Sequence, residues 1–197
     1  RGEYQNTPLH VACGRNGNIE VMMALLDRGA DINARNEYQN TPLHVACRNG
    51  KIEVMMALLD RGADINARGE YQNTPLHVAC GRNGNIEVMM ALLDRGADIN
   101  ARNEYQNTPL HVACRNGKIE VMMALLDRGA DINARDEYQN TPLHVACGRN
   151  GNIEVMMALL DRGADINARN EYQNTPLHVA CRNGKIEVMM ALLDRGA

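Results

Sequence analysis

The sequence has neither tryptophan nor phenylalanine, so its only aromatic side chains are six tyrosines. It also lacks long hydrophobic runs, since stretches such as Val21–Leu26 are far too short to cross a bilayer. Positive charge is not in excess, because the net charge is −3 and the pI is near 6.1. These absences argue against a membrane-spanning protein and against nucleic acid or an anionic membrane as a partner.

The motifs of common catalytic and cofactor sites are absent as well. Neither a G-x-x-x-x-G-K-[ST] nor a G-x-G-x-x-G phosphate loop occurs, and no nucleophile, base and acid form a catalytic arrangement. His10 and Cys13 are metal-capable side chains three residues apart, but a structural zinc site needs four ligands and no second pair is expected nearby. We therefore expect no enzyme activity, no cofactor, no metal and no small-molecule substrate.

Six cysteines recur every 33 or 34 residues at equivalent positions. Equivalent residues of stacked repeats lie about one repeat apart, beyond the ~7 Å Cα separation that a disulfide tolerates. We expect free thiols that act as small buried apolar groups, in a reducing compartment such as the cytoplasm or in recombinant expression. The sequence begins at Arg1 in the middle of a motif and shows no targeting signal.

What the sequence does contain is one motif, TPLH, repeated six times. The motif begins at Thr7, Thr41, Thr74, Thr108, Thr141 and Thr175. The spacings alternate between 34 and 33 residues, so the full period is 67 residues, and a single position changes across it, as Gly2, Gly69 or Asp136. Periods of this size are typical of solenoids, whose units bury their apolar faces only by stacking.

Each unit carries the signals of two short helices. Thr41 is a good N-cap and Pro42 suits the first helical turn, while Gly50 can take the positive φ that ends this helix. A second helix is expected from about Ile52 to Asp60, where apolar residues recur at helical spacing, and Gly62 ends it. The polar connector that follows predicts a hairpin-like finger between units.

The pattern TPLHVAC…NG.IEVMMALLDRGADINA resembles the ankyrin repeat along the whole chain. The resemblance implies a mainly α solenoid, a single array of stacked helix-turn-helix units joined by β-hairpin-like fingers. The array lacks distinct capping repeats, and its repeats are expected at about residues 1–34, 35–67, 68–101, 102–134, 135–168 and 169–197. The near identity of the copies is similar to that of designed consensus arrays, although a recent gene duplication would produce it too.

Alternate repeats differ by one residue between their two helices. HVACGRNGNIEV is one residue longer than HVACRNGKIEV, and the extra residue lies at Gly14, Gly81 and Gly148. Both flanks are core-forming, so we expect the turn to absorb the insertion by a bulge or an early end of the first helix. We interpret it as architectural rather than as part of a binding site.

Two further positions depart from the family pattern. The family usually has glycine two residues before the TPLH threonine, where this chain has Gln5, Gln39, Gln72, Gln106, Gln139 and Gln173. We expect a changed turn rather than a glutamine strained at positive φ. Methionines stand where similar repeats often carry a charge, at Met23, Met56, Met90, Met123, Met157 and Met190. They could form an adaptable apolar ridge, but we expect the first methionine of each pair to pack between repeats and the second to cover neighbouring side chains.

The terminal repeats have the same sequence as internal ones, so neither has a polar outer face. We expect apolar residues to be exposed at one end (Leu9, Val11, Val21 and Leu25) and at the other (Leu177, Ile186, Met189 and Leu192). A head-to-tail contact between these ends is heterologous and need not close. Association that depends on concentration is the expected consequence.

The resemblance to ankyrin repeats also implies protein recognition by a concave face of finger tips and first helices. The tips carry Tyr4, Tyr38, Tyr71, Tyr105, Tyr138 and Tyr172, with Glu37 and Asn40 beside the second tyrosine. Tyrosine is a favoured interface anchor, but six identical tips argue against selection for one irregular partner. Two hypotheses stay open: an engineered scaffold whose partner is itself, by head-to-tail stacking, and a module that binds an unidentified protein.

Overall fold

The computed structural model describes residues 3–82, 84–148 and 152–197. Within these residues the chain forms twelve α-helices, two 3-10 helices and no strand. The α-helices are α1 (Pro8–Ala12), α2 (Ile19–Asp27), α3 (Pro42–Arg48), α4 (Ile52–Asp60), α5 (Pro75–Ala79), α6 (Ile86–Asp94), α7 (Pro109–Arg115), α8 (Ile119–Asp127), α9 (Pro142–Ala146), α10 (Ile153–Asp161), α11 (Pro176–Arg182) and α12 (Ile186–Asp194). The 3-10 helices are η1 (Glu3–Gln5) and η2 (Glu70–Gln72). This is the mainly helical repeat fold that the sequence predicts.

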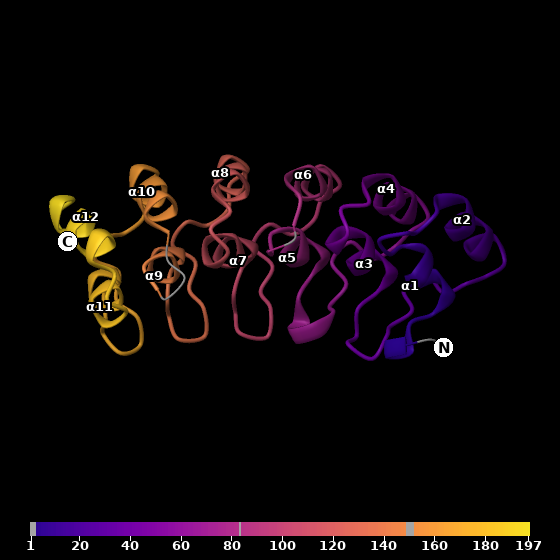
Figure 1. Ribbon diagram of the computed structural model, residues 1–197, viewed down its shortest axis with the longest axis horizontal. Coiled ribbons are helices and arrows are strands. Elements are labelled where there is room, and N and C mark those ends of the chain that lie inside the picture. The colour runs from indigo at the N-terminus through magenta and orange to yellow at the C-terminus, as the bar shows by residue number, and fades with distance from the viewer. Residues whose placement is uncertain (1–2, 83, 149–151) are drawn as a thin grey trace. The chain divides into compact units, whose positions relative to one another are not determined.

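Each repeat consists of two α-helices that pack against each other. The repeats are numbered from one (α1 and α2) to six (α11 and α12). The chain divides into two compact units, residues 1–98 and 99–197. In the first unit α2, α4 and α6 form one row, α1, α3 and α5 form a second row beneath it, and the fingers extend on the far side (Figure 1). Neighbouring repeats pack first helix on first helix and second on second, as α3 does on α5 and α8 does on α10.

The first helix of each repeat begins at the TPLH threonine. Thr41 has extended backbone angles, Pro42 occupies the first turn, and the threonine and His44 complete a capping box. The helix ends before Gly50, whose φ is +67°. The expected N-cap and the expected stop are both confirmed.

The second helix has the bounds expected from the sequence, Ile52–Asp60 in repeat two. Gly62 follows at φ +87°, and the amides of Gly62 and Ala63 donate to the carbonyls of Leu59 and Leu58. These bonds use carbonyls that a helix end otherwise leaves without partners. The glycine therefore closes the helix in the way the pattern indicates.

The core of each unit contains the leucine of TPLH, small residues of the first helix and the first methionine of the second helix. These methionines are fully buried in repeats one to five, as Met22, Met55, Met89, Met122 and Met156. The second methionine of each pair is half-buried in the same repeats. Five of the six cysteines are also buried and all are free. The interpretation of the methionines as packing residues is confirmed.

The one-residue insertion shortens the first helix. Long repeats end it after five residues, as in Pro8–Ala12, whereas short repeats continue it for seven, as in Pro42–Arg48. The turn then places Gly17 so close to the preceding helix that a Cβ atom would lie 2.0 Å from the carbonyl oxygen of Ala12. Asn18 next caps the second helix by accepting the amides of Glu20 and Val21. The early end of helix one, expected from Gly14, is confirmed.

The finger turns differ from the expectation. Each glutamine before TPLH has positive φ, between 55° and 61°, so the glutamine takes the strained conformation in every finger. The prediction of a changed turn was therefore wrong. The bond from the Asn36 amide to the Asn40 carbonyl closes the finger and supplies the physical reason, because this closure requires a left-handed residue just before Asn40.

Candidate functional site

Within each of the two units, a histidine links a repeat to the one that follows it. In repeat two the Nδ1 atom of His44 accepts the backbone amide of Thr41 at 3.2 Å, so the ring proton lies on Nε2, which donates to the Asn73 carbonyl at 2.9 Å. The corresponding Nε2 bonds run from His10 to Asn40 (2.8 Å), from His111 to Asn140 (3.1 Å) and from His144 to Asn174 (2.9 Å). Both ring nitrogens are thus engaged in the fold.

Burial keeps these histidines neutral. It lowers the pKa of His44 and of His111 to about 4, although the carbonyl bond of each ring opposes the shift. The pKa of His10 and of His144 is also lowered, chiefly by burial. The same burial raises the pKa of the thiols of Cys13 and Cys147 to about 12, so these cysteines are poor nucleophiles and poor metal ligands.

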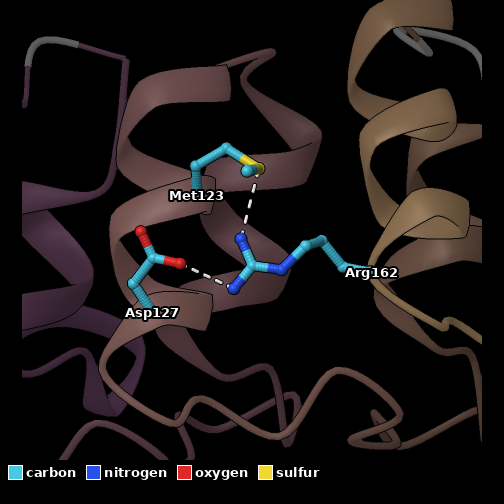
Figure 2. Close-up of polar contacts among 3 residues, drawn as sticks. All are labelled: Met123, Asp127 and Arg162. Carbon is cyan, nitrogen blue, oxygen red and sulfur yellow. Dashed lines mark hydrogen bonds and ion pairs between the residues drawn. The ribbon is translucent and has the colours of Figure 1, made fainter.

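A second link is an ion pair between the arginine that ends one second helix and the aspartate that ends the preceding one. The N–O distances are 2.9 Å for Arg61–Asp27, 2.8 Å for Arg95–Asp60, 2.6 Å for Arg162–Asp127 and 2.8 Å for Arg195–Asp161. Figure 2 shows the guanidinium of Arg162 between the Asp127 carboxylate and the thioether of Met123, whose sulfur lies 3.9 Å from it. The second methionine therefore packs under the cation of the next repeat.

Repeat one presents an apolar surface, here called the N-terminal end face, formed by Val11 and Val21. Their exposed fractions are 64% and 51%. In repeat three the residue equivalent to Val21 is Val88, and it is fully buried. The difference follows from position alone, because the two repeats have the same sequence and repeat two covers repeat three.

Repeat six presents the complementary surface, here called the C-terminal end face, formed by Ile186, Met190 and Leu193 with His178 and Cys181 beside them. Ile186 is 70% exposed, and Met190 and Leu193 are about half exposed. His178 and Cys181 are exposed as well, whereas their equivalents in repeats two and four are fully buried. The next repeat is what covers these residues inside each unit.

The structure brings together only part of the residues expected at the ends. Val21 and Ile186 lie on the two end faces, and Leu25 and Met189 are partly exposed. Leu9 and Leu192 are buried within their own repeats, at 1% and 0% exposure, so their assignment to an exposed end was wrong. Sequence reasoning missed Met190, Leu193, Cys181 and His178. A comparison with the equivalent positions in repeat two, which lie toward repeat three, could have identified them.

The tyrosines stand on the fingers and are 38% to 64% exposed. The rings of Tyr4 and Tyr38 lie 5.8 Å apart at a tilt of 41°, a favourable separation for an aromatic pair. Glu37 is exposed beside them, and its amide donates to the Tyr4 carbonyl. Asn40 was expected on the binding surface. It is 1% exposed and its side chain accepts the Glu70 amide, so it belongs to the junction between repeats instead.

A groove of ≈ 540 Å³ lies on this side of the second unit. Tyr105 and Tyr138 line it together with Arg115, Glu137 and Val145. Arg115 donates to the side chain of Asn107 at the same place. The groove thus offers two aromatic rings, both signs of charge and the apolar side chain of Val145.

No group of three or more His, Cys, Asp or Glu that could hold a metal ion occurs among the residues that the structure describes. None of the helices in that part of the chain is both long and apolar enough to cross a membrane. A protein-family model described as ankyrin repeats, in three copies, matches residues 2–69, 67–136 and 135–197. No curated protein matches the sequence.

Proposed function

Because the chain belongs to the ankyrin-repeat family, whose arrays are protein-interaction scaffolds and generally not enzymes, we propose that it is a scaffold whose partner is a second copy of itself, bound head to tail. One observation carries this proposal: Val21, His178 and Cys181 are exposed at the ends, whereas their equivalents are buried where two repeats meet inside a unit. The other end-face residues are only partly exposed at the equivalent inner positions. The junction of repeats two and three is therefore a template for the contact between copies. A contact of this kind uses different surfaces on the two partners and can propagate.

The apolar area supports a weak contact. Complete burial of a valine, leucine, isoleucine or methionine side chain contributes about 1.5–3 kcal/mol, and the end faces expose Val11, Val21, Ile186, Met190 and Leu193 by 47% to 70%. Association costs roughly 4–15 kcal/mol in lost rigid-body freedom. At the lowest of these costs the balance leaves up to about 4 kcal/mol, which corresponds to a dissociation constant on the order of millimolar.

The near identity of the 67-residue copies supports an engineered origin for this array. Evolved binding faces carry different side chains at different places to match an irregular partner. Here each structural position is filled by the same residue in every copy, apart from Gly2, Gly69 and Asp136. A repeated surface is suited to a partner with the same period, and a second copy has that period.

Sedimentation equilibrium over a wide range of concentration tests the proposal. The mean mass should rise continuously above 21.8 kDa and should pass the mass of a dimer without a plateau. Val21→Lys, which places a charge on the N-terminal end face, should keep the chain monomeric. Glu53→Gln changes the net charge by the same amount at an exposed position of α4 and should associate like the unchanged chain. A mass of 21.8 kDa at all concentrations would falsify the proposal.

The groove beside Tyr105 and Tyr138 favours a second candidate function, the binding of a peptide segment of another protein. Aromatic rings with charged groups of both signs are typical of interface anchors. Selection of a random peptide library on the immobilised chain tests this candidate. Enriched peptides should share a motif and should lose binding to a Tyr105→Ala, Tyr138→Ala variant, with Tyr4→Ala as the matched control. Enrichment without a shared motif, or binding that survives both substitutions, would count against it.

A further inference from the structure

We propose that the contact between copies, which presupposes the head-to-tail association above, continues the repeat stack in register and with one fixed direction. Asp194 of one copy forms an ion pair with Arg28 of the next, and His178 of the first donates to the carbonyl of Asn6 of the second. Together the two bonds supply the polar links that the end repeats lack.

The ion pair follows from the series of links between second helices. In both units the arginine after a second helix contacts the aspartate of the repeat before it, at N–O distances of 2.6 to 2.9 Å. Arg28 follows the second helix of the first described repeat, and Asp194 ends that of the last described repeat. Neither has an ion-pair partner among the described residues. The two ends therefore carry opposite charges, Arg28 at one and Asp194 at the other, at the positions that pair between neighbouring repeats.

The histidine bond follows in the same way. The Nδ1 atom of His178 contacts the Thr175 hydroxyl at 2.8 Å, as in every other repeat. Its Nε2 atom has no partner among the described residues, whereas Nε2 of His44, its equivalent in repeat two, donates to the carbonyl of Asn73. Asn6 is the residue of repeat one equivalent to Asn73. Docking the two ends in register therefore places Nε2 of His178 opposite the carbonyl of Asn6, which is the acceptor that the equivalent histidines use.

Repeat one is already shaped for this contact. Its finger forms the 3-10 helix η1 with Tyr4 at φ 58° and ψ 27°, and the finger of repeat three forms η2 with Tyr71 at φ 53° and ψ 30°. The finger of repeat three packs against repeat two, where the Glu70 amide donates to the Asn40 side chain. The finger of repeat one already has the same conformation, so docking requires no rearrangement there.

The alternation of loop lengths agrees with the same register. Repeat six is a short repeat and repeat one is a long repeat, so a head-to-tail junction has the order found between repeats two and three and between repeats four and five. Contacts between two like ends would instead bring Arg28 against Arg28 or Asp194 against Asp194. Contact between like charges raises the free energy of association, so the head-to-tail direction is favoured.

A charge-swap cycle tests the ion pair. Association constants are measured by sedimentation at low ionic strength for the unchanged chain, Arg28→Asp, Asp194→Arg and the double variant. Each single reversal should weaken association about threefold or more, because two like charges then meet. The double variant should return to within about twofold of the unchanged chain, since the pair is restored with its charges exchanged. Addition of salt should reduce the differences.

A crosslink measures the register directly. In an Arg28→Lys chain, a zero-length carbodiimide should join the introduced amine to Asp194 of a second copy, and mass spectrometry should identify that peptide pair. Asp194→Asn in the same background is the control and should remove it. Failure of the unchanged chain and all three charge variants to associate would overturn the head-to-tail scaffold itself. Association that is equal in all four, or crosslinks from position 28 only to other carboxylates, would leave self-association standing and overturn the register.

Discussion

Each finger contains a glutamine whose backbone lies in the left-handed region that favours glycine. In repeat two this residue is Gln39, with φ 60°, an exposed side chain and an amide that donates to the Asn36 carbonyl. A side chain at such a φ costs roughly 1 kcal/mol. The strain is repeated in every finger, so it is a property of the array and not of one site.

Replacement of one such glutamine by glycine should therefore stabilise the protein. We expect Gln39→Gly to raise the free energy of unfolding by about 0.5–1 kcal/mol, part of the relief being lost to the more flexible unfolded chain. Denaturation in urea measures the shift of the midpoint, and Gln39→Ala is the control that keeps the strain. A glycine variant no more stable than the alanine variant would show that the turn is not strained.

The buried histidines make stability depend on pH. Their pKa is about 4 in the folded protein for His44 and His111, below the ordinary value of 6.5 that applies to the unfolded chain. Between these values the unfolded chain binds more protons than the folded one, so stability rises with pH and is lost as the pH falls. The stability that the neutral histidines contribute is fully present above about pH 6.5 and is lost as the pH falls towards 4.

We expect the free energy of unfolding to fall by up to about 1.4 kcal/mol per pH unit for each of these two histidines as the pH drops from 6.5 to 4. Unfolding at a series of pH values measures the slope. A His44→Gln, His111→Gln chain should have a shallower slope over this range, whatever its absolute stability. An unchanged slope would mean that the histidines do not cause the pH dependence.

At the scale of helices and turns, much could be predicted from the residues because the signals are local. Thr41 and Pro42 indicate where the first helix begins, and Gly62 indicates where the second one ends. The state of Gln39 could not be obtained in this way. The conformation of the finger depends on its closure and on its contacts with adjacent repeats, which outweigh the local preference of one residue.

The exposure of the end residues was only partly predictable for a related reason. Helical periodicity shows which residues are apolar but not which side of the core they contact. Leu9 and Leu192 pack within their own repeats, while Val21 and Ile186 face outward toward the position of an absent neighbour. The direction in which a repeat stacks decides this, and a one-dimensional pattern does not contain that direction.

The turn of the long repeats depends on a glycine that the short repeats do not need. A Cβ atom on Gly84 would lie 1.9 Å from the carbonyl oxygen of Ala79, a contact that no side chain tolerates. The short repeats have Gly50 instead, where a Cβ atom meets only ordinary contacts and the cost comes from a φ of +67°. The long turn thus requires both the inserted Gly81 and the glycine three residues later, Gly84.

We expect Gly84→Ala to lower the free energy of unfolding by more than about 2 kcal/mol, because the backbone must move to relieve the overlap. Gly50→Ala is the matched substitution and should cost only about 1 kcal/mol, the usual penalty for alanine at positive φ. Urea denaturation of both variants gives the comparison. Equal losses would indicate that the long turn is no tighter than the short one.

For the molecule as a whole, the central claim is that its two end faces are halves of the junction found inside each unit. Cys181 reports on this claim without any substitution. It is the exposed cysteine among six, and its equivalents in repeats two and four, Cys47 and Cys114, are fully buried beneath the following repeat. Association in register should therefore bury the Cys181 thiol.

The most direct measurement is the rate at which Cys181 reacts with a thiol reagent as protein concentration is raised. We predict one fast thiol per chain in dilute solution, and a rate that falls as the mean mass rises. The rate should stay constant in the Val21→Lys chain, which lacks the receiving face. A Cys181 that reacts equally fast at every concentration, while the mean mass grows, would contradict the account by placing the contact elsewhere.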